Sequence, residues 1–316
     1  MGGKMKKVLV VYFSQTGQVA ELVQTITAPL VEDPSIEVFF ERLEPLHPYP
    51  FPWPFFRFAS VMPESVLMDP PLLKPLQCDV KKAWDLIILA YQPWYLSPSP
   101  PITAFLKDEK AVDLLGSRPV ITVIGCRGMW LMAQEKMKEF LKGLHARLIG
   151  NIVLKDKGGM AVSLVTTVRK VFTGKKGKFL GVFPSSGVSE NEVKEISRFG
   201  HAIRGALQAE SPGLTETLLQ GYGAVKVDTR FIRAEKTGRW LFLFWSRIIG
   251  VAGPYGSLGN RIALLGFYLS LVLFMVIGFS TSFIARPITS RIFKEKLKRQ
   301  REHYEWPSGS DTFHIP

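Results

Sequence analysis

Five short segments rich in apolar residues recur along the first half of the chain. They are Val8–Phe13, Ile36–Leu43, Asp85–Ala90, Pro119–Gly125 and Leu148–Leu154. Short apolar runs that are rich in β-branched residues are typical of strands buried on both faces of a parallel sheet. The pattern therefore predicts five parallel strands.

Segments with helical spacing of apolar residues lie between and after these strands. They cover residues 18–29, 102–106 and 129–145, and the capping-box sequence Ser189-Glu190-Asn191-Glu192 predicts a further helix that ends near residue 209. Strands that alternate with helices predict an α/β fold with an open, doubly wound sheet. Because crossovers are right-handed, the strand order 2-1-3-4-5 is favoured.

Two insertions enlarge this domain, which is predicted to span residues 1–223. The first, near residues 45–75, contains the sequence HPYPFPWPFFRF at residues 47–58, where the prolines argue against regular helix. The second, near residues 157–187, has an apolar stretch at residues 160–172 that could be helical, followed by a basic tract at residues 174–178.

The character of the chain changes after residue 223. Residues 224–260 are predicted to form a basic and aromatic linker with an interfacial amphipathic helix at Trp240–Ile249, which places Trp240 and Trp245 at headgroup depth; a docking helix is the alternative. Ile262–Ala285 then runs without a charge. At 1.5 Å per residue this segment would be about 36 Å long, against about 30 Å for a hydrocarbon core. A transmembrane helix is predicted over residues 261–286, with a buried core helix as the alternative and a basic tail at residues 287–316.

The predicted span creates a conflict of topology. The basic tail favours the cytoplasmic side, and so does the N-terminal domain, yet a single span would separate the two. Either the region around residues 240–285 forms a shallow hairpin, or the tail is translocated against its charge. The sequence leaves both alternatives open.

Composition and charge exclude several classes of protein. A hydrophobic content of 47% excludes a disordered chain, and two cysteines exclude a disulfide framework and a cysteine-based zinc site, so no metal is expected. The net charge of +13 suggests nucleic-acid binding at first. However, residues 154–180, 224–248 and 286–302 hold 20 of the 40 basic residues and only 5 of the 27 acidic ones. Because two of these segments flank the apolar span, we expect anionic lipid headgroups as the partner and no nucleic acid.

The segment Ser14-Gln15-Thr16-Gly17-Gln18 lies between the first predicted strand and the first predicted helix. Hydroxyl groups and backbone N–H groups at a helix N-terminus can donate to a phosphate, and a glycine lets the backbone approach it closely. The segment therefore predicts a phosphate-binding loop. A plain helix cap is the alternative.

The third predicted strand is followed by Gln92-Pro93-Trp94-Tyr95. Aromatic side chains at the carboxyl end of a strand, at a topological switch point, favour a planar ligand. Trp94 and Tyr95 could stack on its ring, and backbone groups near Gln92 could meet its polar edge. The alternative is that Trp94 and Tyr95 only pack against the rest of the protein and contact no ligand.

The fourth predicted strand is followed by Cys126-Arg127-Gly128. The glycine permits a tight loop, and Arg127 is the candidate catalytic residue because its guanidinium could approach a ring or substrate oxygen. An exposed arginine without a role is the alternative. His47, His145 and His201 are more typical of structural or exposed positions.

These motifs resemble the flavodoxin-like FMN proteins, especially the quinone-reductase-like members. The residues that carry the resemblance are VLVVYFSQTGQVAELV at 8–23, the segment 85–106 and VITVIGCRGMW at 120–130, and it extends over about residues 5–210. It implies FMN, with its phosphate at Ser14, Thr16 and Gly17 and its ring between residues 92–95 and 126–128, and NADH or NADPH as a candidate reductant. Val19 replaces the usual last hydroxyl of the phosphate loop, so one donor is missing.

A narrower resemblance is to the proteins described as dialkylresorcinol condensing enzymes, which accompany bacterial pathways for resorcinol lipids and aryl-polyene pigments. It rests on KKVLVVYFSQTGQ at 6–18, PYPFPWPFF at 48–56 and PESVL at 63–67. It implies oxidation or reduction of a lipophilic cyclic diketone or resorcinol at the bacterial inner membrane, with the domain in the cytoplasm. Condensation itself is not supported, because a ketosynthase needs a nucleophilic cysteine with histidine partners.

Three functions follow from these patterns. The first is a membrane-associated, FMN-dependent oxidoreductase with a lipophilic substrate. The second is an electron-carrier flavodoxin, although the chain lacks the usual acidic excess. The third is a membrane-anchored protein that keeps the fold without catalysis. A homo-oligomer remains an open alternative.

Overall fold

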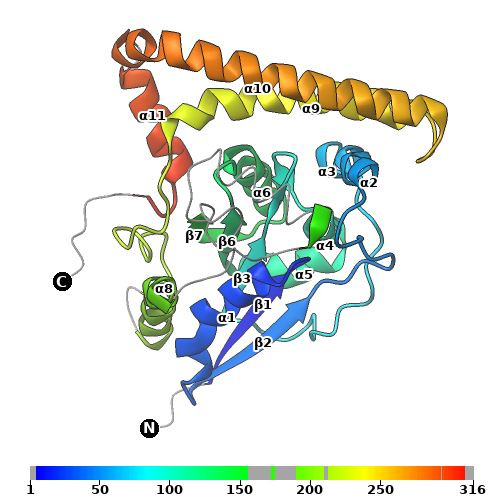
Figure 1. Ribbon diagram of the computed structural model, residues 1–316. Coiled ribbons are helices and arrows are strands. Elements are labelled where there is room, and N and C mark those ends of the chain that lie inside the picture. The colour runs from blue at the N-terminus through cyan, green and yellow to red at the C-terminus, as the bar shows by residue number, and fades with distance from the viewer. Residues whose placement is uncertain (1–4, 156–171, 175–189, 210–212, 293, 310–316) are drawn as a thin grey trace.

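One parallel sheet organises the first half of the chain. The structure is a computed structural model that describes residues 5–155, 172–174, 190–209, 213–292 and 294–309. The strands of this sheet are β1 (Lys6–Tyr12), β2 (Ile36–Arg42), β3 (Leu86–Tyr91), β6 (Pro119–Cys126) and β7 (Arg147–Lys155). They lie side by side in the order β2-β1-β3-β6-β7, and every neighbouring pair is parallel (Figure 1). This is the predicted order 2-1-3-4-5, so the flavodoxin-like fold class is confirmed.

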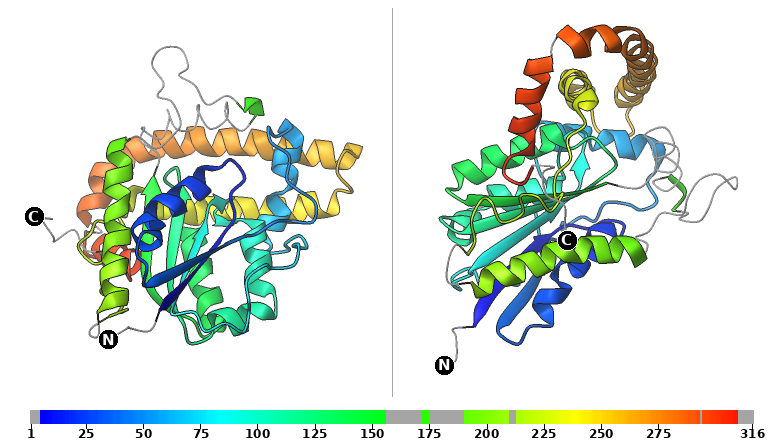
Figure 2. Two further views of the ribbon diagram at one scale, coloured as in Figure 1. Left: turned by 90° about the horizontal axis from the view of Figure 1, so that it is seen from below. Right: turned by 90° about the vertical axis from the view of Figure 1, so that its left-hand side faces the viewer.

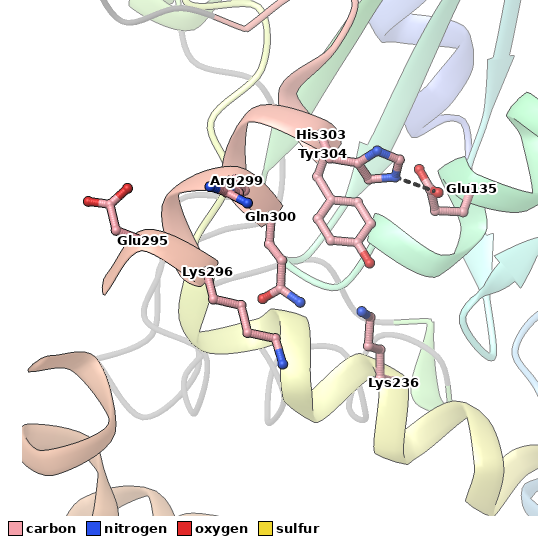
Figure 3. A pocket seen from close by; sticks show the side chains of 8 residues that line it. All are labelled: Glu135, Lys236, Glu295, Lys296, Arg299, Gln300, His303 and Tyr304. Atoms are coloured by element: carbon pink, nitrogen blue, oxygen red, sulfur yellow. Dashed lines mark hydrogen bonds and ion pairs between the residues drawn. The ribbon is translucent and has the colours of Figure 1, made fainter. Parts of the chain in front are cut away.

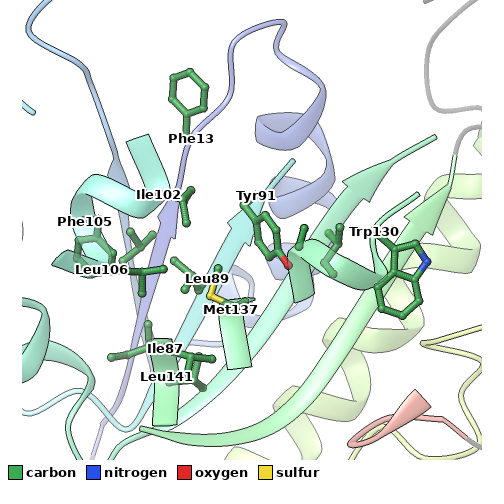
Figure 4. Close-up of a cluster of buried hydrophobic side chains, with 14 of the residues drawn as sticks. Phe13, Ile87, Leu89, Tyr91, Ile102, Phe105, Leu106, Trp130, Met137 and Leu141 are labelled. Carbon is green, nitrogen blue, oxygen red and sulfur yellow. The ribbon is translucent and has the colours of Figure 1, made fainter. Parts of the chain in front are cut away.

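Helices cover both faces of the sheet because its strands are apolar on both faces. Val8 and Val10 of β1 pack on one side under α1 (Gln18–Val31) and α8 (Glu190–Gln208). Leu9 and Val11 pack on the other side, which is covered by α4 (Pro100–Lys107), α5 (Lys110–Leu115) and α6 (Leu131–Gly143) (Figure 4). The two layers of core hold the carboxyl ends of the strands in a fixed arrangement.

Close packing of α8 on α1 gives a prediction for stability. A Cβ atom at Gly200 would lie 2.0 Å from the backbone oxygen of Ile26, whereas a Cβ at Gly205 of the same helix would meet nothing within 4 Å. We expect Gly200→Ala to destabilise the protein by about 1–3 kcal/mol, because the helices must separate. Gly205→Ala, the matched control, should be neutral or stabilise by up to about 1 kcal/mol. Urea denaturation checks both, and equal effects of the two changes would contradict this packing.

The first insertion is partly helical. Residues 55–60 form α2 (Phe55–Ser60) and residues 62–66 form α3 (Met62–Val66). The expectation that residues 47–58 contain no helix is therefore wrong for its last four residues. Pro54 occupies the N-cap position of α2, and the next proline is Pro63, so no ring interrupts the helix between them.

Two long helices form a hairpin across the carboxyl-terminal edge of the sheet (Figures 1 and 2). They are α9 (Thr229–Val251) and α10 (Leu258–Ile292). Their contact is close because the Trp245 ring lies over Gly266, where a Cβ would come within 2.6 Å of it. Trp245 thus packs against α10, whereas Trp240 is exposed. The predicted depth of both rings at a membrane surface stays a prediction. Leu258–Val276 of α10 is long and apolar enough, by length and composition, to cross a membrane.

The chain returns from the hairpin to the sheet. The last helix, α11 (Lys294–Glu305), reaches α6, where His303 Nε2 lies 2.9 Å from Glu135 Oε2. Beyond it, Ser308 Oγ accepts a hydrogen bond of 2.7 Å from the backbone N–H of Asn151 in β7. The C-terminal segment therefore lies on the same side of the hairpin as the sheet, as the shallow-hairpin alternative requires.

Residues 224–227 also pack against the sheet. The backbone N–H of Val153 in β7 donates to Ala224 O at 2.8 Å, and Val225 and Val227 are buried in the core under α6. This segment is part of the core rather than a free linker. Ser189 of the predicted capping box, and most of the second insertion, lie outside the described residues.

Candidate functional site

Three loops meet at the carboxyl-terminal edge of the sheet. They follow β1, β3 and β6, which are neighbours: Tyr12 pairs with Ala90, and Tyr91 pairs with Ile124. The loops therefore bring together the predicted phosphate loop at residues 14–18, the aromatic loop at residues 92–95 and the glycine loop at residues 126–128. This is the switch point at which doubly wound sheets bind ligands.

The phosphate loop opens α1 in the way that an anion site requires. Ser14 is buried, and its Oγ accepts a hydrogen bond of 3.2 Å from the backbone N–H of Ala20. Gly17 is the N-cap of α1, with a left-handed φ of 85°, and a Cβ there would meet nothing within 4 Å. A helix N-terminus with open space beside a left-handed glycine can receive a phosphate. Because the O–H of a serine can donate while its oxygen accepts, Ser14 and Thr16 can both offer a hydroxyl donor to a phosphate.

The side chain of Gln15 forms hydrogen bonds with the first insertion. Its Nε2 donates to Pro50 O at 3.1 Å, and its Oε1 accepts from Trp53 Nε1 at 3.1 Å. These bonds attach the phosphate loop to the first insertion. Val19, in place of the usual hydroxyl, is buried and would lie 3.5 Å from a Cβ at Gly125. Its side chain thus contributes to the core between α1 and β6.

The aromatic loop forms a tight and strained turn. Pro93–Trp94 (β4) pairs with Ser97–Pro98 (β5), and both residues between them are left-handed, Tyr95 at φ 48° and Leu96 at φ 59°. Turns of this kind normally carry Gly, Asn or Asp, because bulky side chains disfavour positive φ. Packing compensates here: Tyr95 OH donates to Phe58 O at 2.6 Å, and Leu96 is buried.

Trp94 is the centre of an aromatic cluster. Its ring meets those of Phe13, Tyr49 and Trp53 edge to face, at centroid distances of 6.0, 5.1 and 5.7 Å. The contacts continue through Trp53–Phe58, Phe58–Tyr95 and Tyr95–Phe242, each between 5.4 and 5.7 Å. Phe242 belongs to α9, so rings in contact connect the phosphate loop with the helical hairpin. The first insertion supplies the rings between them.

The glycine loop follows β6 directly. Cys126 is the last residue of the strand and is buried, while Arg127 is half-buried. Gly128 has a φ of 144°, and a Cβ there would meet nothing within 4 Å. The loop thus offers a second glycine beside open space. The other cysteine, Cys78, is not activated as a thiolate. Burial raises the pKa of its thiol to about 12, so the thiol stays protonated near neutral pH.

Glu235 of α9 holds the helix that follows this loop. Its carboxylate accepts hydrogen bonds from the backbone N–H groups of Trp130, at 3.0 Å, and Met132, at 2.9 Å. Trp130 is the N-cap of α6 and makes no side-chain cap, so Glu235 caps α6 from a distant helix. Burial raises the pKa of Glu235 to about 7, although these N–H groups and Lys155 favour the charged form.

Sequence reasoning missed Glu235. The signal was present: it is one of only two acidic residues in the basic segment 224–248, and it shares the buried face of α9 with Ile232 and Gly238 at a spacing of three. A lone carboxylate on an apolar helical face needs a buried donor. Local patterns could not name that donor, because α6 lies about 100 residues earlier.

A buried polar chain fixes β3 to α6. Tyr91 OH donates to Gln134 Oε1 at 2.7 Å, and Gln134 Nε2 donates to Thr122 Oγ1 at 3.1 Å. Burial raises the pKa of Tyr91 well above its usual value, so the hydroxyl stays protonated as a donor. Because Tyr91 immediately precedes the aromatic loop, this chain fixes where that loop starts.

A cleft lies away from the three loops. It has a volume of about 650 Å³ and lies between α6, α9 and α11 (Figure 3), where the side chains around it are mostly charged: Glu135, Lys236, Glu295, Lys296, Arg299, Gln300, His303 and Tyr304. Such a lining does not suit an apolar ring. The candidate site is therefore defined by the loops rather than by this cleft.

His47, His145 and His201 are exposed. Among the described residues, no group of His, Cys, Asp and Glu could hold a metal ion.

No protein-family model and no curated protein matches the sequence. Solved structures that share part of its architecture include a flavoprotein from Lactobacillus acidophilus in complex with FMN, which is 16% identical at a TM-score of 0.38, with 47% of this chain and 93% of that one covered. A putative flavoprotein from Bacteroides eggerthii is 18% identical at a TM-score of 0.38, with coverages of 54% and 99%. A flavodoxin from the domain Archaea is 12% identical at a TM-score of 0.37, with coverages of 64% and 99%. The fold of this chain is established by its own strand order.

Proposed function

We propose that the chain is an FMN-dependent oxidoreductase that acts at a membrane on a lipophilic substrate. The observation that carries this proposal is the meeting of the three loops after β1, β3 and β6, with left-handed Gly17 and with Gly128 each beside open space. A flat cofactor with a terminal phosphate fits this arrangement, because the phosphate needs a helix N-terminus and the ring needs loops with small residues.

Different residues would hold the phosphate and the ring of FMN. Ser14, Thr16, Gly17 and the first N–H groups of α1 bind the phosphate, while residues 92–95 and 126–128 enclose the ring. Arg127 is the candidate to approach a ring or substrate oxygen. When bound, FMN accepts and returns a hydride at its N5 atom, and NADH or NADPH is the candidate source of electrons.

The aromatic cluster supports a lipophilic substrate. It extends from Phe13, beside the phosphate loop, to Phe242 of the hairpin. Phe13 and Trp53 are buried in the cluster, whereas the rings of Tyr49, Phe58, Trp94, Tyr95 and Phe242 are only partly buried. A quinone-like molecule, or a cyclic diketone of the resorcinol-lipid type, combines a flat polar ring with an alkyl chain. We propose that the ring of the substrate reaches the flavin and that its chain follows the aromatic cluster toward the membrane. The domain faces the cytoplasm in this proposal.

The test compares two quinones that differ only in their alkyl chain. The full-length chain, loaded with FMN and reduced without oxygen, is mixed with a long-chain quinone or with its short-chain analogue. We expect the bound flavin to be reoxidised faster by the long-chain quinone. Equal rates would overturn the lipophilic specificity, and reoxidation by a redox protein alone would favour an electron carrier instead.

A further inference from the structure

The outward face of the α9–α10 hairpin is an apolar stripe. Between residues 258 and 276 of α10, where the side chains are described, the large apolar ones that are more than half exposed are Leu258, Ile262, Leu265, Leu269, Val272, Leu273 and Val276. Spacings of three and four residues place them on one side of the helix. On α9, Trp240, Phe244 and Val251 are also exposed. Contiguous apolar surface of this kind marks a contact with a partner or a membrane.

The charge around this stripe is mostly positive. The chain contains no Asp or Glu between residues 236 and 294, whereas seven Lys and Arg residues fall in that range. Arg247 and Arg261 are exposed on the hairpin, and where α11 begins Lys294 and Lys298 are exposed together with Glu295. Apolar side chains with an excess of cations beside them match a bilayer with anionic headgroups.

The return of the chain excludes a single crossing by α10. If α10 crossed a bilayer fully, α11 would lie on the far side and would lose the contacts of His303 with Glu135 and of Ser308 with Asn151. A second crossing by α9 would have to place Arg239 and Arg247 inside the hydrocarbon core, which is costly. The hairpin can therefore meet a bilayer only from one side.

We propose that the α9–α10 hairpin lies in the plane of an anionic membrane, within one leaflet, and that both ends of the chain stay on the same side. The stripe enters the acyl region, and the basic side chains remain among the headgroups. Leu96 and Tyr95 then lie directly beneath the membrane-bound helices, because a Cβ at Gly238 of α9 would come within 3.3 Å of Leu96. This mode of docking does not depend on flavin binding.

The first test measures binding to vesicles by sedimentation. We expect the full-length chain to bind vesicles of phosphatidylcholine and phosphatidylglycerol (two to one) at least about tenfold more tightly than vesicles of phosphatidylcholine alone. The double variant Leu269→Lys and Leu273→Lys should bind about tenfold or more weakly, because two apolar side chains that would enter the acyl region of the bilayer become charged. Leu72→Lys with Val112→Lys is the matched control, since both residues are exposed apolar residues of the sheet domain. Equal loss in the two double variants would overturn the proposal.

The second test measures topology. The full-length chain carries a tag at each end and is bound to the same vesicles, and protease is added outside. We expect both tags to be removed at the same rate. Protection of the C-terminal tag would show that α10 crosses the bilayer, and a stable dimer in solution that does not bind vesicles would show that a second copy covers the stripe. Either result would overturn the proposal without bearing on FMN.

Discussion

A chain that carries Thr16→Val together with Gly17→Val is expected to retain no FMN. The first change removes one of the two hydroxyl donors, Ser14 and Thr16, that the loop offers to the phosphate. The second change places a branched side chain at a φ of 85°, in the open space beside α1. Each hydrogen bond to a charged group contributes about 1.5–3 kcal/mol, so the loss of affinity should be roughly 100-fold or more. The ratio of FMN to protein after gel filtration measures it.

The control for this variant is Gly256→Val. Gly256 is also left-handed, at φ 91°, and a Cβ there would meet nothing within 4 Å, but it lies in the turn between α9 and α10. It therefore reproduces the backbone strain away from the three loops. We expect this control to keep its FMN. A double variant with the same flavin content as the control would show that residues 14–18 do not bind the phosphate.

Replacement of Glu235 is expected to change how stability depends on pH. In the native protein the pKa of Glu235 is raised to about 7, whereas the same group in an unfolded chain titrates near its model value of 4.5. The native state thus holds this proton more tightly, and the resulting stability is fully present below pH 4.5 and is lost as the pH rises through 7. The loss amounts to about 3 kcal/mol. In Glu235→Gln this part of the pH dependence should disappear.

Urea denaturation at pH 5 and pH 8 measures the effect as a difference between variants. Glu21→Gln is the control, because Glu21 is exposed on α1. Glu235→Ala should be less stable than Glu235→Gln at both pH values by about 1–3 kcal/mol, since the amide oxygen in Glu235→Gln can still accept from one of the two buried N–H groups and Glu235→Ala offers no acceptor. Identical pH dependence in wild type and Glu235→Gln would refute the role assigned to this carboxyl group.

The strands were predictable because the information is local. Runs such as Val8–Phe13 and Pro119–Gly125 are apolar on both faces, and only a buried parallel strand accommodates that pattern. The pattern also predicted that Gly17 lets the backbone approach a ligand closely, whereas its left-handed φ of 85° is known only from the structure. Strand order then follows from the handedness of crossovers. The placement of the three loops at one edge is a consequence of that order.

The remaining features depend on contacts between distant segments. Tyr95 and Leu96 are not of the residue types that favour positive φ. Their turn is explained by packing, since the Tyr95 ring contacts Phe58 and Phe242. The role of Glu235 could not be predicted, because it depends on the absence of a side-chain cap at the start of α6. The sequence leaves open on which side of the hairpin the C-terminal segment lies, and the hydrogen bond between Ser308 and Asn151 of β7 places it beside the sheet. No local pattern of apolar and charged residues contains such pairings.

The absorbance spectrum of the full-length chain, reconstituted with FMN and freed of excess cofactor, tests the central claim most directly. The account predicts a flavin spectrum that stays with the protein at about one FMN per chain and that bleaches when NADH or NADPH is added without oxygen. A folded chain that retains no flavin would contradict the assignment of the loops after β1, β3 and β6 as an FMN site.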